Sequence, residues 1–167
     1  MRRHGALACA LAGLVAATAV GTSQASPGDV DDGCFVVRQG RGIVTVVAEG
    51  VVFGRFFSGR VSIDDLTPED AKAPRVFGDT RVQEITETRV LYSGQNVRFR
   101  VSGKFRLRVF AVDTDLSFVG NGHAVVTSAD YLDAGEYSAD ATSFCEDGFE
   151  PLPDLPKRVS IGSASTD

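Results

Sequence analysis

The chain has 167 residues, of which 43% are hydrophobic and 23% charged, and its formal net charge is −5. This length and composition predict one globular domain and exclude a disordered chain or a protein with several membrane spans. Acidic residues outnumber basic ones by 22 to 17, which argues against a general nucleic-acid-binding protein. Two histidines, three cysteines and no tryptophan leave few residues for metal ligation or nucleophilic catalysis.

The first 25 residues have the features of a secretory signal peptide. Arg2 and Arg3 give a basic start, and residues 6–20 form an uncharged run rich in Ala, Leu and Val. The run is short for a bilayer span, which takes about 20 residues, and small residues precede a cleavage site after Ala25. Cleavage there removes two arginines and no acid, so the net charge of −5 becomes −7. We expect one domain over residues 26–167, without a transmembrane segment, that is secreted or associated with the cell envelope.

Cleavage after Ala25 also removes Cys9 and leaves two cysteines, Cys34 and Cys145. An exported chain meets oxidising conditions, in which an even number of thiols tends to pair. We therefore predict a Cys34–Cys145 disulfide that ties the first strand to a segment near the end of the domain. The alternative, two free or metal-binding thiols, is weaker because the cysteines lack CxxC spacing and one histidine remains.

The first half of the domain consists of strand-forming runs separated by glycine. We expect strands at residues 35–37 and 43–48, with a break at 40–42, and a period-two alternation over 51–63. The stretch 64–80 contains Pro68, Pro74 and Gly78, so it predicts a long loop. Thr67-Pro68 is typical of a helix start, and Pro74 limits that helix to at most a short one.

The most regular alternation covers residues 97–112, where the odd positions are mostly apolar. The even positions carry five basic side chains: Arg98, Arg100, Lys104, Arg106 and Arg108. On a helix these side chains would scatter around the axis, so the pattern predicts one long strand, or two bent at Gly103, with the basic residues on one face.

The last third of the chain predicts several further short elements. A turn is expected at residues 113–115, and strands at 116–119 and 124–127 flank a hairpin at 120–122. Gly135 separates Tyr131-Leu132 from a strand residue, Tyr137. The proline-rich segment 151–156 is expected to be extended, with a last strand at 159–161.

Short alternating runs with almost no helix predict an all-β fold, either an antiparallel β-sandwich or a small β-barrel. The runs at 40–46, 50–54 and 58–64, the arginine-alternating pair at 97–109 and the Gly-x-Gly at 120–122 resemble an uncharacterised group of small exported proteins of actinobacterial type. The resemblance covers about residues 40–162 and rests on strand and glycine rhythm. It implies the fold and supplies no site, and the cysteine pair and the 64–80 loop lie outside that rhythm.

The sequence holds no motif for a catalytic, metal or cofactor site. His123 is the one histidine outside the signal peptide, and its place after Gly122 predicts an exposed turn residue. There is no GxSxG and no phosphate-binding glycine loop. Acids at 29, 31 and 32 and at 113 and 115 lack EF-hand spacing and are expected in turns, with another kind of calcium site as the alternative. We expect no cofactor and no enzyme activity; the alternative is a hydrolase with paired carboxylates.

The basic face is a candidate site, since five positive charges in an acidic chain would suit a polyanion. The interpretation that we favour from the sequence pairs these charges with acids of neighbouring strands, namely Glu84, Glu87 and Asp115. No aromatic residue alternates with the charges, which argues against specific nucleic-acid binding. We expect an exported, non-catalytic binding or structural module, with an anionic cell-envelope polymer as a candidate partner. The alternative is a module that presents the 64–80 loop to a secreted protein, for example as an inhibitor.

Overall fold

The computed structural model describes residues 32–70, 73–129, 134–142 and 144–162, and it confirms the expected antiparallel all-β fold. The elements are β1 (Gly33–Asp65), the 3-10 helix η1 (Pro68–Asp70), β2 (Arg75–Glu84), β3 (Arg89–Ser128), β4 (Glu136–Asp140), β5 (Glu150–Pro151) and β6 (Lys157–Ile161). They form a single sheet in the order β2-β3-β1-β4-β5, and β6 pairs with β3. The one short helix agrees with the prediction.

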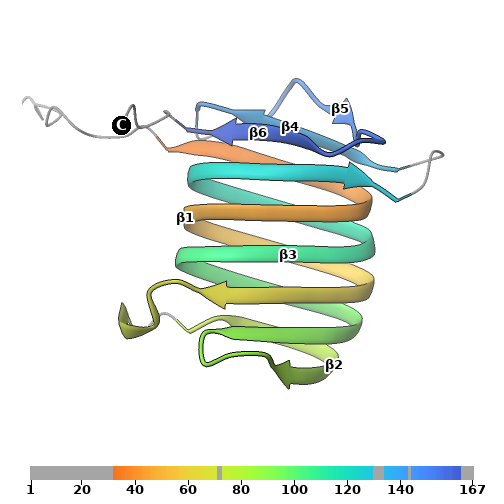
Figure 1. The fold of residues 1–167 in the computed structure, drawn as a ribbon. Helices are drawn as coiled ribbons and strands as arrows, with labels where there is room; N and C mark the ends of the chain where they lie inside the picture. Colours follow the sequence, from red (N-terminus) through yellow and green to blue (C-terminus); the bar gives the residue numbers. More distant parts are fainter. Residues whose placement is uncertain (1–31, 71–72, 130–133, 143, 163–167) are drawn as a thin grey trace, which may run out of the picture.

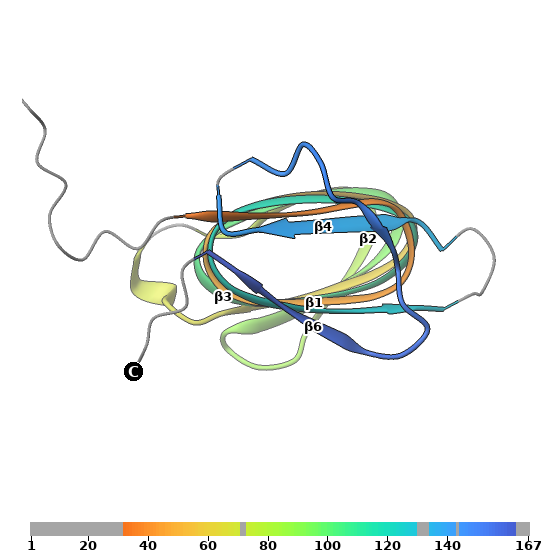
Figure 2. The ribbon, with the colours of Figure 1, turned by 90° about the horizontal axis from the view of Figure 1, so that it is seen from above.

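Strands β1 and β3 pair antiparallel and wind together into a spiral (Figure 1). Ile43 pairs with Phe110 on one side and with Thr127, 17 residues further along β3, on the other. One turn therefore takes 17 residues from each strand, which corresponds to a path of about 56 Å and a rise of about 9.5 Å. Seen along its axis, the spiral is a flattened oval with two broad walls (Figure 2), and the sheet is not closed into a barrel.

Glycines bend the two long strands at one narrow edge of the oval. Gly33, Gly120, Gly50 and Gly103 are successive register partners and so form a column across the sheet. Gly50 and Gly120 have φ values of 155° and 146°, which side chains of L-residues rarely allow. The strands continue through these positions. The expected break at 40–42 and the expected hairpin at 120–122 are therefore wrong, because the glycines turn the strand without ending it.

Bulges change which residues face the interior. Gln39, Asn96 and Asp113 have φ between 50° and 53°, which is uncommon for residues other than glycine. In β3 the buried positions are odd up to Ala111 and even from Thr114 onward, so Asp113 is the extra residue of a bulge. The expected turn at 113–115 is thus wrong, because the strand kinks there and continues.

Phenylalanine and valine side chains fill the space between the two walls. The rings of Phe105 and Phe118 meet edge to face with their centroids 6.0 Å apart, and both are fully buried. The burial of Phe105 and of the other apolar odd positions of 97–111 confirms the apolar face expected for that run. In contrast, the period-two pattern over 51–63 is interrupted: the buried positions are even up to Phe56 and odd from Val61 onward. This switch leaves Phe53 outside the core.

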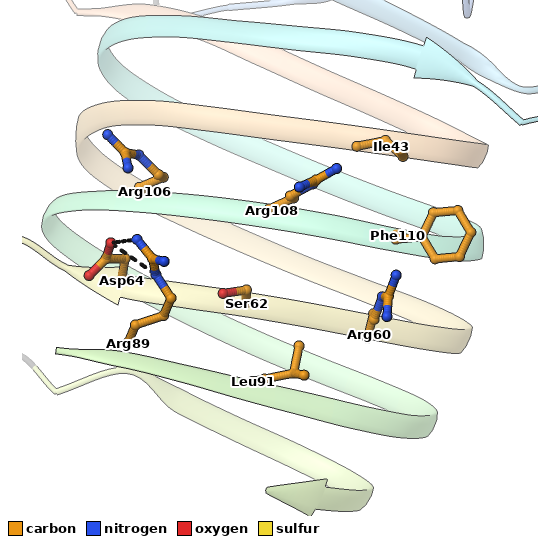
Figure 3. A pocket seen from close by; sticks show the side chains of 9 residues that line it. All are labelled: Ile43, Arg60, Ser62, Asp64, Arg89, Leu91, Arg106, Arg108 and Phe110. Carbon is orange, nitrogen blue, oxygen red and sulfur yellow. Dashed lines mark hydrogen bonds and ion pairs between the residues drawn. The ribbon is translucent and has the colours of Figure 1, made fainter. Parts of the chain in front are cut away.

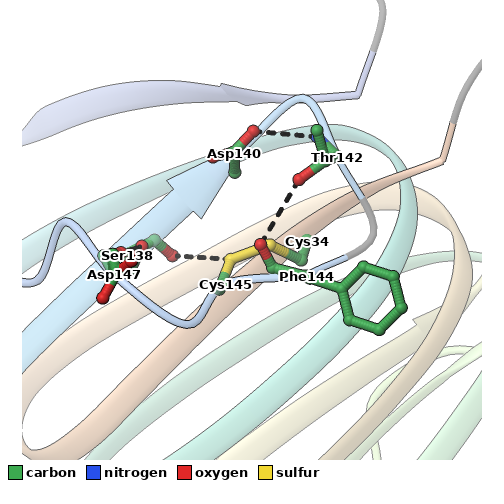
Figure 4. Close-up of a disulfide and its surroundings, with 7 residues drawn as sticks. All are labelled: Cys34, Ser138, Asp140, Thr142, Phe144, Cys145 and Asp147. Atoms are coloured by element: carbon green, nitrogen blue, oxygen red, sulfur yellow. Dashed lines mark hydrogen bonds between the residues drawn. A yellow bond between two sulfur atoms is a disulfide. The ribbon is translucent and has the colours of Figure 1, made fainter.

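The last three strands cover one end of the spiral, where the predicted disulfide, Cys34–Cys145, is also found (Figure 4). The two Cα atoms lie 5.8 Å apart, and the bridge joins β1 to the segment between β4 and β5. The Tyr137 hydroxyl donates to Glu150 at 2.8 Å, and Lys157 forms an ion pair with the same carboxylate. These contacts link β4, β5 and β6 to one another.

The expected loop at 64–80 is shorter than predicted. Residues 64 and 65 end β1, and β2 occupies residues 75–84, so the connection spans 66–74. Gly78, with φ of 124°, bends β2 without ending it, and β2 pairs with β3 on both sides of that residue. Among the described residues, no helix is long and apolar enough to span a membrane.

Candidate functional site: an arginine cleft on one wall

The winding of β3 places the five basic residues, which were expected on one face, on different sides of the spiral. Their side chains all point outward, but Arg98 and Arg106 are eight residues apart, about half of a 17-residue turn. Arg98 and Arg100 therefore lie on one wall, and Arg106 and Arg108 lie on the opposite wall. Lys104, next to the glycine column, forms an ion pair with Glu49 at 3.3 Å. The expectation of one continuous basic face is wrong because the strand turns between these residues.

The spiral also brings arginines from other segments to Arg106 and Arg108 (Figure 3). In the register of β1 and β3, Arg106 lies opposite Asp64, Arg108 opposite Ser62, and Phe110 opposite Arg60. A cleft of about 470 Å³ lies over these strands. Its lining residues are Ile43, Arg60, Ser62, Asp64, Arg89, Leu91, Arg106, Arg108 and Phe110. We call this the arginine cleft; four positive charges and one negative charge line it.

Asp64 is the one acid in the arginine cleft, and its charge is already matched. It is buried, and both of its carboxylate oxygens accept hydrogen bonds. The donors are Arg89, the first residue of β3, and Thr88, which precedes it. Arg89 donates through Nη2 at 2.6 Å and through Nε at 3.2 Å, and the Thr88 hydroxyl donates at 2.9 Å. The hydrogen bonds from Arg89 are the main reason why the pKa of Asp64 is below its usual 3.8.

This lowered pKa makes a prediction for stability against pH. A carboxyl group with a lower pKa in the folded state stabilises the fold above its unfolded pKa, and the contribution is lost as pH falls through the folded value. We expect the wild type to be more stable than Asp64→Asn at pH 6, with the difference shrinking below about pH 3.8. Chemical denaturation at a series of pH values measures this. A difference that stays constant down to pH 2 would contradict it.

The other three arginines of the cleft are free to bind an anion. Within the described part of the chain, Arg60, Arg106 and Arg108 form no ion pair, and Arg60 lies over the Phe110 ring at 5.2 Å. The acids expected to neutralise the basic face do not do so. Asp115 binds Arg55 at 2.5 Å, and in the same described segments Glu84 and Glu87 are in no ion pair. The arrangement therefore presents guanidinium groups to solvent around the Ser62 hydroxyl.

His123 lies on the same wall as the arginine cleft, near the end of β3, where the strand continues and no hairpin forms. Val47 is the register partner of both His123 and Arg106. Partial burial, followed by the nearby charges of Arg158 and Arg106, lowers the pKa of His123 below 6.5. The lowered pKa favours the neutral form of the imidazole, which adds no charge to this wall.

The described members of the two predicted acid clusters make contacts within the fold. Asp113 lies 3.8 Å from Arg41, and Asp32 accepts a hydrogen bond from Asn121 at 2.9 Å. Over the described ranges, no group of three His, Cys, Asp or Glu side chains is placed to hold a metal. Residues 29 and 31, the predicted signal peptide at 1–25 and Tyr131-Leu132 lie outside the described residues.

Comparison with known proteins adds no assignment. No family model, no curated protein and no solved structure matches the chain. The resemblance to exported actinobacterial-type proteins therefore stays a prediction, as do the hydrolase and protein-partner alternatives.

Proposed function

We propose that the protein is an exported binding module that holds an anionic cell-envelope polymer in the arginine cleft. The observation that carries the proposal is the convergence of Arg60, Arg106 and Arg108, none of which forms an ion pair within the described residues, on one wall of an acidic protein. Guanidinium groups suit phosphate and carboxylate because they donate several hydrogen bonds in a fixed plane. Because Arg89 is held by Asp64, it frames the cleft, and the other three supply the free charge.

The layout of the cleft favours an extended ligand. Arg106 and Arg108 are two residues apart on β3, which places their Cα atoms about 6.6–6.8 Å apart. Arg60 lies on the adjacent segment of β1, so the charges spread across two neighbouring strands. The apolar side chains of Ile43 and Leu91 lie among them. A polymer with repeated charges would contact several arginines at once, whereas a single small anion would contact one or two.

Neutralising the three free arginines tests the proposal. We expect Arg60→Gln/Arg106→Gln/Arg108→Gln to weaken binding to soluble polyphosphate roughly a hundredfold, at about 1 kcal/mol per arginine. Wild-type affinity should fall as salt rises, and the variant should show a shallower salt dependence. Isothermal titration calorimetry at several salt concentrations measures both quantities.

The opposite wall supplies a control with the same loss of charge. Arg75→Gln/Arg98→Gln/Arg100→Gln removes three arginines from that wall and should retain most of the affinity for polyphosphate. Equal losses in the two triple variants would show a dependence on net charge alone, and the proposed site would be wrong. The same comparison is then made on purified cell-wall material.

A further inference from the structure

The wall opposite the arginine cleft carries exposed aromatic rings among arginines. Phe53, Phe57 and Phe77 are 54%, 53% and 63% exposed. In the register of the sheet, Phe53 lies opposite Arg100, and Arg98 lies opposite Phe77. We call these five side chains, together with Arg75, the aromatic wall.

Two surface hollows show that the members of the aromatic wall are contiguous. Phe57, Phe77 and Arg98 line a hollow of about 700 Å³. Phe53 and Arg98 line a second one of about 530 Å³. Arg98 is shared by both hollows, so the three rings surround it on one surface. Three large exposed apolar side chains this close together on a folded monomer are typical of a contact surface.

The arginines of the aromatic wall are available to a partner. Throughout the described segments, Arg75, Arg98 and Arg100 form no ion pair, and Arg100 lies 5.3 Å from the Phe53 ring centroid. Asp115 is engaged by Arg55. The surface therefore offers apolar area and positive charge together, and its partner must match both.

We propose that the aromatic wall docks on a bilayer that contains anionic lipids. The phenylalanine rings would enter the boundary between headgroups and acyl chains, while the arginines contact lipid phosphates. The wall is one of the two broad sides of the oval (Figure 2), which suits a flat and extended partner. Charge complementarity selects anionic over zwitterionic lipid. This inference does not depend on the polymer site, which lies on the other wall.

The chain has no tryptophan, so one introduced tryptophan reports its own surroundings. We expect Phe77→Trp to show a blue-shifted emission and reduced acrylamide quenching with vesicles of phosphatidylglycerol and phosphatidylcholine. The matched control is Phe110→Trp in the arginine cleft, where the ring is also exposed and no shift is expected. Vesicles of phosphatidylcholine alone should give little change. No shift on anionic vesicles, or the same shift at both positions, would overturn the proposal.

A cosedimentation assay separates the two walls. Phe53→Ser/Phe57→Ser/Phe77→Ser should lose about tenfold or more in affinity for the anionic vesicles and keep its affinity for polyphosphate. The triple glutamine variant of the arginine cleft should behave in the opposite way. Loss of vesicle binding in the cleft variant alone would overturn the docking surface. If the triple serine variant is misfolded by circular dichroism, Phe77→Ser replaces it. Wild-type binding to single-stranded oligothymidine in place of vesicles would show a nucleic-acid surface and contradict the proposal.

Discussion

Replacing Cys34 and Cys145 by serine is expected to lower the free energy of unfolding by about 2–5 kcal/mol. The bridge spans 111 residues in sequence, so it removes a large loop-closure entropy from the unfolded chain. It also fastens the start of β1 to the segment after β4, where Cys145 Sγ lies 3.8 Å from the Ser138 carbonyl oxygen (Figure 4). Urea denaturation of the double variant and the wild type measures the difference.

Reduced wild-type protein is the control for that measurement. It has the same sequence as the oxidised form, so it should show the same loss of stability as the double serine variant. A single Cys145→Ser variant leaves Cys34 buried as a free thiol and should lie close to the double variant. Equal stability of the reduced and oxidised forms would contradict the expected role of the bridge.

Gly120→Ala is expected to cost about 2–5 kcal/mol, combining backbone strain with overpacking. A Cβ at Gly120 would lie 2.7 Å from the Gly50 Cα and even closer to the Glu49 carbonyl oxygen. These are backbone atoms of the adjacent turn of the spiral, which side-chain rotation cannot relieve. The φ of 146° adds strain for any residue with a side chain. Thermal and urea unfolding followed by circular dichroism measure the change.

Gly148→Ala is the matched control because it separates strain from crowding. Gly148 has φ of 74°, and the nearest atom that its Cβ would meet is the Ser138 hydroxyl at 4.0 Å. We expect a loss of about 1 kcal/mol there, from the left-handed backbone alone. If Gly120→Ala and Gly148→Ala cost the same, the close approach of neighbouring turns has no effect on stability.

The all-β class and the disulfide follow from local features of the sequence. Alternation over 97–111 is regular enough to exclude a helix, and the two cysteines that remain after the predicted signal peptide allow one pairing. Where strands end is not a local property here. The local sequence around Gly50 and Gly120 is compatible both with a hairpin and with a bend in a continuous strand. Which of the two forms depends on the neighbouring turn of the spiral against which each glycine packs.

A 17-residue spacing is the signal that sequence reasoning missed. Gly33 and Gly50 are 17 residues apart, and so are Gly103 and Gly120. Recognising that period would have predicted a spiral, because repeats at a fixed spacing mark stacked structural units. It would also have placed Arg89 directly below Arg106, which is 17 residues further along the chain.

The candidate site was predicted only in part for the same reason. Arg106 and Arg108 belong to the run of basic residues that the sequence shows, but Arg60 reaches them from β1. The sequence shows no aromatic residue alternating with the charges along β3, and it gives no sign that Phe53 of β1 lies beside Arg100 across the sheet. Adjacency between strands is set by register, and the bulge at Asp113 shifts which side chains face outward.

Because β1 and β3 wind together, the molecule can become longer or shorter only by whole turns of the spiral if its cross-section is to stay the same. Since every turn takes 17 residues from each strand, adding 17 residues to both would lengthen the molecule by about 9.5 Å and keep its cross-section. An insertion of another size in one strand would move arginines from one wall toward the other. Relatives of this protein should therefore differ by whole turns, with insertions in the two strands that match each other.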